Sequence, residues 1–119
     1  MMIYKICPRL LWDEAVAAGV FAGAEVDLKD GFIHFSTASQ MKETASKHFS
    51  GQRDLLLLGI DESCLGDALK WEVSRGGALF PHLYAELKTS DVTRIDELPL
   101  DSNGQHVFPN DLVSDANDA

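Results

Sequence analysis

The residues that could do chemistry gather first in one short segment, residues 30–37, which reads DGFIHFST. His34, Ser36 and Thr37 come at the end of a β-rich stretch and directly before a helical pattern. Free backbone amides and the helix dipole at such a junction favour an anion. We therefore take His34 as a candidate catalytic residue and the two hydroxyls as ligand contacts. An ordinary strand followed by a Ser/Thr helix cap is the structural alternative.

A second segment, residues 71–84, reads WEVSRGGALFPHLY. The planar donors of Arg75 match a phosphate or carboxylate, the glycines allow close backbone approach, and the aromatic rings offer stacking faces. This composition predicts a pocket for an anionic, ring-bearing small molecule. Its candidate ligand-binding residues are Glu72, Arg75, Gly76, Phe80, His82 and Tyr84. The alternative is a tight loop in which Arg75 pairs with Glu72 and the aromatic rings belong to the core.

Several other kinds of site are not supported by the spacing. The chain has no GxSxG, phosphate-loop, HExxH or CxxC motif. His34, His48 and His82 do not follow a recognised zinc-ligand pattern, so we predict no metal. Cys7 and Cys64 are isolated in the sequence and are expected to be free thiols in a reducing cytosol.

The elements that must position these residues indicate an α+β fold. An early helix is expected with Pro8 at its first position and an end at Gly19, and a second over residues 38–48, with a capping box formed by Thr37 and Gln40. Short strands are predicted at residues 3–6, 31–35, 54–60, 70–74, 83–87, 92–98 and 105–108. Strands outnumber helices and both helices lie early, which argues against regular βαβ alternation.

The charge balance restricts the partners. Asp and Glu number 19 against 10 Lys and Arg, a formal net charge of −9, and such a surface repels a phosphate backbone. We therefore expect no nucleic-acid partner. Glu25, Asp27 and Asp30 form an acidic cluster, which we interpret as a solvated loop rather than a calcium site.

The length allows one domain with one core. Residues 1–109 are expected to form it, whereas residues 110–119 are small, polar and acidic and predict a disordered tail. The longest nearly apolar run, residues 55–60, is far too short for a membrane span, and no signal-peptide pattern opens the chain. We expect a cytoplasmic protein without a membrane partner; its oligomeric state is left open.

Four motifs together resemble the small bacterial "domain of unknown function 952" family. They are IYKI at residues 3–6, DGFIHFST at 30–37, a TAxxHF helix at 44–49, and WEVSRGGALFPHLY at 71–84. The resemblance covers about residues 3–109. That family is similar in fold to the ADP-ribosyltransferases, so the resemblance implies split, curved antiparallel sheets, with two main helices in the N-terminal half and NAD as a possible cofactor.

The resemblance also implies roles for particular residues. ADP-ribosyltransferases place an Arg or His in their first strand, and Lys5 lies at the corresponding place here. Their second motif is a strand that ends in hydroxyl residues before a helix, which Ser36 and Thr37 match. Their third is a glutamate on a late strand that supports an oxocarbenium-like transition state, and Glu86 is the nearest candidate.

Three functions therefore stay open. The first is binding of an anionic nucleotide-type ligand with cleavage of the nicotinamide–ribose bond of NAD, or ADP-ribosyl transfer. The second is a non-catalytic binding or regulatory module that has lost the transferase activity. The third is a dimerising structural domain whose motifs are internal packing. Convergence of His34, Arg75 and Tyr84 on one cleft would favour the first two, and an acidic group facing the sugar would favour the enzyme.

Overall fold

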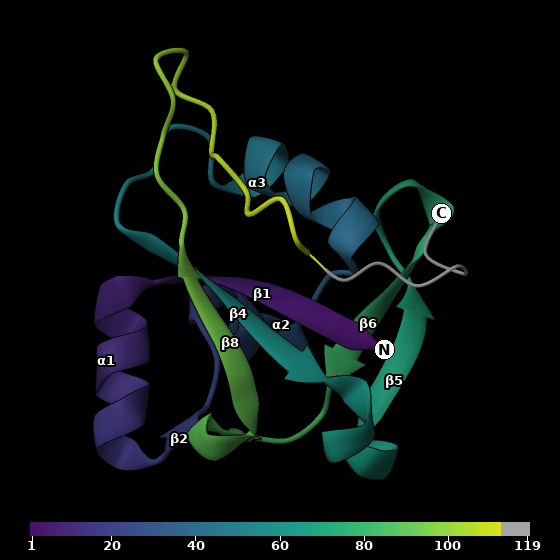
Figure 1. Ribbon diagram of the computed structural model, residues 1–119. Helices are drawn as coiled ribbons and strands as arrows, with labels where there is room; N and C mark the ends of the chain where they lie inside the picture. Colours follow the sequence, from purple (N-terminus) through teal and green to yellow (C-terminus); the bar gives the residue numbers. More distant parts are fainter. Residues whose placement is uncertain (113–119) are drawn as a thin grey trace.

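Two three-stranded antiparallel sheets frame the computed structural model (Figure 1), which describes residues 1–112 apart from the side chain of Arg75. The first sheet has the order β1 (Met2–Pro8), β4 (Leu55–Asp61) and β8 (Val92–Glu97). The second has the order β3 (Ile33–His34), β6 (Leu79–Leu83) and β5 (Leu69–Val73). Tyr4 and Ser36 exchange two backbone hydrogen bonds of 2.8 Å, which join β1 to the chain just after β3.

The central strand β4 is buried on both faces, as its four consecutive leucines predict. Side chains alternate across a strand. Leu56, Leu58 and Ile60 therefore enter one apolar cluster with residues of the second sheet and α1, whereas Leu55 and Leu57 enter another. The core thus lies on both sides of the first sheet.

Three α-helices lie in the N-terminal half. They are α1 (Arg9–Ala18), α2 (Glu25–Asp30) and α3 (Met41–His48). α3 covers the face of the first sheet that carries Leu57, with its own Met41 and Ala45 in that cluster (Figure 1). α1 begins at Arg9, one residue after the predicted start at Pro8, and it ends at Gly19 as predicted.

Helix α2 corrects the prediction of a solvated acidic loop at residues 25–30. Asp27 accepts a hydrogen bond from the Ala24 amide at 2.8 Å, which satisfies one free donor at the start of the helix. Gly31, with φ +87°, ends the helix in the left-handed conformation that glycine allows. The acidic residues therefore belong to an ordered helix that precedes β3 in the chain.

The remaining elements are short. A two-stranded pair joins β2 (Val20–Phe21) to β7 (Leu87–Lys88). The 3-10 turns are η1 (Ala38–Gln40), η2 (Glu62–Cys64), η3 (Gly66–Ala68), η4 (Arg75–Gly77) and η5 (Thr89–Asp91). No helix within residues 1–112 is long and apolar enough to cross a membrane.

The α+β class with antiparallel sheets is confirmed, but two predicted strands are wrong. The strand predicted at 83–87 is divided, because β6 ends at Leu83 and the Tyr84 amide turns away to donate to the Ala68 carbonyl at 2.8 Å. At residues 105–108 there is a single bridge between Leu100 and His106. A turn at Ser102-Asn103-Gly104 connects the two residues of this bridge.

The predicted solvated tail does not begin at residue 110. Arg94 Nη2 lies 2.6 Å from Asp111 Oδ1, and Arg94 Nη1 donates to the Asp111 carbonyl at 3.2 Å. Leu112 packs against the apolar cluster beneath α3. These contacts extend the domain to Leu112, and residues 113–119 lie outside the described part of the chain.

Truncating Leu112 tests this boundary. Because its half-buried side chain packs on the core, we expect Leu112→Ala to lower the free energy of unfolding by about 1 kcal/mol. Val107→Ala is the control, since Val107 is 47% exposed and its loss should cost less than about 0.5 kcal/mol. Urea unfolding measures both. If both variants lost equally little free energy of unfolding, the folded domain would end at residue 109 as first predicted.

Candidate functional site

Four rings meet on the outer face of the second sheet: Phe32, His34, His82 and Tyr84, here called the ring cluster. The register of β3 and β6 places His34 opposite His82, and the ring centroids are 5.4 Å apart in a T-shaped arrangement. Phe32 stacks on His82 at 4.1 Å and contacts His34 at 4.6 Å and Tyr84 at 5.2 Å. The two segments singled out in the sequence therefore meet in one place.

Strand alternation explains why these histidines face outward. Ile33, Phe35 and Leu83 all lie in the apolar cluster between the sheets. Successive side chains of a strand point to opposite faces, so His34 and His82 take the other face. The alternation of Ile33, His34 and Phe35 along the sequence predicts this separation.

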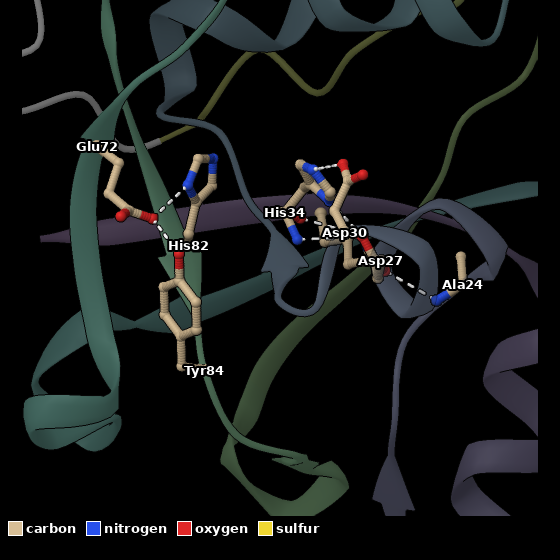
Figure 2. Close-up of polar contacts among 8 residues, drawn as sticks. Ala24, Asp27, Asp30, His34, Glu72, His82 and Tyr84 are labelled. Atoms are coloured by element: carbon tan, nitrogen blue, oxygen red, sulfur yellow. Dashed lines mark hydrogen bonds and ion pairs between the residues drawn. The ribbon is translucent and has the colours of Figure 1, made fainter.

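The first histidine is held by a buried carboxylate, that of Asp27 (Figure 2). Asp27 Oδ1 accepts from the His34 backbone amide at 3.1 Å and lies 2.6 Å from His34 Nδ1. Asp27 Oδ2 accepts from the Ala24 amide at 2.8 Å and from Lys5 Nζ at 3.0 Å. Lys5 Nζ also donates to the His34 carbonyl at 3.0 Å. Both carboxylate oxygens are thus fully used, and Nδ1 is the donor of the His34–Asp27 bond.

Asp27 is ionised although it is only 2% exposed. Burial alone would raise its pKa. The hydrogen bond from His34, the charge of Lys5 and the Ala24 amide outweigh burial and lower the pKa to about 2. Lys5 and Asp27 therefore form a buried ion pair, in which each charge depends on the other.

The other nitrogen of His34 meets a second carboxylate. His34 Nε2 lies 3.0 Å from Asp30 Oδ2, and the side chains of His34 and Asp30 are 31% and 42% exposed. Each ring nitrogen of His34 thus lies close to a carboxylate oxygen, at 2.6 Å for Nδ1 and 3.0 Å for Nε2. His34 is therefore the partly exposed member of a carboxylate–imidazole–carboxylate chain.

The second histidine shares its carboxylate with a tyrosine. His82 Nδ1 lies 2.9 Å from Glu72 Oε1, and the Tyr84 hydroxyl donates to the same oxygen at 2.7 Å (Figure 2). The hydrogen bonds from Tyr84 and His82 lower the pKa of Glu72, and the bond to Glu72 raises the pKa of Tyr84. Tyr84 thus keeps its proton and acts as a donor, while the side chain of His82 is buried.

Three of the predicted ligand contacts have structural partners. Lys5 is buried and bonded to Asp27, as described above. Ser36 Oγ lies 3.1 Å from Thr44 Oγ1 of α3, and the Thr37 amide donates to Gln40 Oε1 at 2.9 Å. The Gln40 half of the predicted capping box is therefore present, and Ser36 and Thr37 are both buried at the strand–helix junction.

The other predicted residues lie at the two ends of β6. Phe80 is buried and faces Glu72 in the β5–β6 register. Gly76 occupies the η4 turn with φ +69°, beside the backbone of Arg75, whose side chain is outside the described part. Glu86 is exposed in the loop between β6 and β7, so its predicted place on a strand is wrong. The chain leaves the sheet at Tyr84, two residues earlier.

The sequence reasoning missed Asp27, Asp30 and Phe32. Their signal was the spacing itself: Asp27, Asp30 and His34 are three and four residues apart, with Gly31 as a helix-ending residue between them. A short helix over this spacing brings both carboxylates toward the start of the next strand. The acidic cluster was therefore part of the site.

A cavity of about 540 Å³ lies between the start of α3 and the segment at residues 106–112, and none of the predicted site residues lines it. Within residues 1–112, no three His, Cys, Asp or Glu side chains are grouped as metal ligands. The ring cluster is the place where four of the predicted site residues, His34, Glu72, His82 and Tyr84, come together.

Removing the charge of Asp27 tests the buried pair. We expect Asp27→Asn to lower the free energy of unfolding by about 3–5 kcal/mol, because Lys5 is left buried and uncompensated. Asp30→Asn, on an exposed pair, should cost less than about 1 kcal/mol. The double variant Lys5→Met/Asp27→Asn should recover part of the loss. Chemical denaturation would contradict the pairing if the two single Asp variants were equally stable.

The same pair predicts how stability depends on pH. The pKa of Asp27 is about 2 in the fold, below the value of about 3.9 for an unfolded aspartate. Its contribution of about 2–3 kcal/mol is therefore complete above about pH 4 and is lost as the pH falls through 2. Urea unfolding between pH 6 and pH 2 should show the wild type and Asp27→Asn converging toward acid. A constant difference between them would argue against this assignment.

Comparisons with known proteins agree with this architecture. The family model described as "Protein of unknown function (DUF952)" matches residues 6–95. The crystal structure of protein CC0527 from Caulobacter crescentus is 53% identical, covers 90% of this chain and 94% of its own, and gives a TM-score of 0.87. The solution NMR structure of CC0527 is 55% identical over 87% of this chain and 90% of its own, with a TM-score of 0.80. No curated protein matches the chain. The chain belongs to the DUF952 family of proteins of unknown function.

Proposed function

We propose that this protein binds a small, ring-bearing anion of the nucleotide class at the ring cluster. One observation carries the proposal: two histidines, each bonded to a carboxylate from another element, meet beside Phe32 and Tyr84 on one sheet face. Carboxylate-oriented imidazoles are typical of groups that exchange protons or donate to a ligand. Such an arrangement is more than packing requires.

The cluster offers both stacking and hydrogen bonding. Tyr84 is 44% exposed and His34 is about a third exposed, so both are within reach of a ligand. Phe32 lies between them and contacts both rings. A planar ring of the ligand would stack on Phe32 and Tyr84, while His34 donates to an oxygen atom.

The anionic group requires positive charge against a net charge of −9. Lys5 is bonded to Asp27, so it is not free to neutralise the ligand. We assign the anion clamp to Arg75, since its η4 turn connects β5, which carries Glu72, to β6, which carries His82. Gly76 in the same turn leaves the backbone accessible.

The finer form of the proposal is an ADP-ribosyltransferase-like domain that cleaves the nicotinamide–ribose bond of NAD. Its support is the motif resemblance together with the split antiparallel sheets. In this form His34 is the proton-transferring group. Glu72, which lies beside the cluster, takes the place proposed for Glu86 as the carboxylate near the developing positive charge.

A non-catalytic binding module is the second candidate, and one observation favours it. Glu86 is exposed on a loop, and Glu72 is already bonded to His82 and Tyr84 through one oxygen. A carboxylate held in this way supports binding through its partners without acting on the sugar. Release of nicotinamide from NAD, followed by mass spectrometry, distinguishes the enzyme from the module.

Calorimetric titration with NAD and ADP-ribose tests the binding proposal. We expect Arg75→Lys to weaken binding about 10- to 100-fold, because the charge stays but the two-pronged geometry is lost. His34→Gln should weaken it about tenfold. Arg53→Lys, at an exposed position on the loop before β4, is the matched control and should bind as the wild type does.

Two outcomes would overturn the binding site, and a third would overturn the role of Arg75 alone. A wild-type protein that binds neither nucleotide at millimolar concentration has no such site. Equal binding by Arg75→Lys, His34→Gln and the control would place the ligand elsewhere on the molecule. Loss of binding together with a collapsed thermal midpoint in Arg75→Lys would make Arg75 structural.

A further inference from the structure

We propose that Asp30 occupies an oxyanion subsite on His34, and that the phosphate or carboxylate group of a ligand replaces it there. The inference rests on the proposed function only for the identity of the ligand. The subsite itself rests on the partners of the two His34 nitrogens.

These two nitrogens have very different partners. Nδ1 bonds Asp27, whose side chain is 1% exposed and also accepts from Ala24 and Lys5. Nε2 lies 3.0 Å from an oxygen of Asp30, whose side chain is 42% exposed. Asp27 cannot leave without isolating a buried lysine, whereas Asp30 can rotate into water. The ring is therefore fixed on one side and exchangeable on the other.

Asp30 is also held weakly. It is the last residue of the six-residue helix α2, and His34 is the only ion-pair or hydrogen-bond partner of its carboxylate within the described residues. An exposed ion pair of this kind contributes little to stability, since both groups are well solvated when apart. A soluble anion can thus compete with it.

The position that Asp30 takes shows what the subsite accepts. A carboxylate oxygen lies 3.0 Å from Nε2, and an oxygen of a phosphate group fits the same position. Phe32 lies 4.6 Å from the His34 ring, so a group bound there is next to a stacking surface. The subsite therefore takes the oxyanion of a ligand whose ring lies over Phe32 and Tyr84.

Replacing Asp30 removes the carboxylate that competes with a ligand and leaves the ring of His34 in place. Asp30→Asn and Asp30→Ala should bind inorganic phosphate and acetate at His34 about five- to tenfold more tightly than the wild type, because the competing carboxylate is gone. Glu25→Gln is the matched control, since it removes one exposed negative charge from the same helix. NMR shifts of the His34 ring nitrogens follow the titration. A stronger response to phosphate than to acetate assigns the subsite to phosphate groups.

Three results would overturn the inference. Asp30→Asn and Glu25→Gln could bind phosphate and acetate equally tightly, which would mean that the change in net charge alone explains the effect. The response could persist in His34→Gln/Asp30→Asn, which would place the anion elsewhere. Both Asp30 variants could lose their folded amide spectrum, which would make Asp30 structural.

The failure of the proposed function gives a different pattern. If the wild type binds no nucleotide but phosphate still reports on His34 in Asp30→Asn, the subsite stands and the nucleotide proposal falls. If nucleotides bind the wild type but phosphate and acetate do not respond to Asp30→Asn, the proposed function stands and this subsite falls.

Discussion

The buried contact between Lys5 and Asp27 is the constraint on which this structure depends. Lys5 extends from β1 in the first sheet, and Asp27 lies on α2, directly before the second sheet. The same two residues bond the backbone and the ring of His34. One ion pair therefore joins the sheets and orients the imidazole, so the stability of the fold and the geometry of the site cannot be changed separately.

Much of the frame could be predicted from the sequence because it follows periodicity and local chemistry. The run of leucines in β4 indicates a strand buried on both faces, and Gly19 and the Thr37–Gln40 pair mark helix ends. These signals depend on residues that are close in the sequence, so they can be read without knowing the tertiary contacts. The alternation around Ile33 likewise predicts which face His34 takes.

The rest depends on contacts between distant residues. No local pattern places Lys5 against Asp27, 22 positions later in the chain, and an acidic stretch at the surface usually stays solvated. The end of β6 was missed for the same reason, since the Tyr84 amide turns to the Ala68 carbonyl. Glu86 therefore lies on a loop, and Glu72 is the carboxylate beside the two predicted rings, His82 and Tyr84.

Glu72 has a further property, because a single oxygen serves two donors. Tyr84 Oη and His82 Nδ1 compete for the electron density of Oε1, and the first is at the surface whereas the second is buried. Any molecule that draws the phenol away strengthens the bond to the imidazole, and its return weakens it. The shared oxygen of Glu72 therefore couples the exposed phenol of Tyr84 to the buried imidazole of His82.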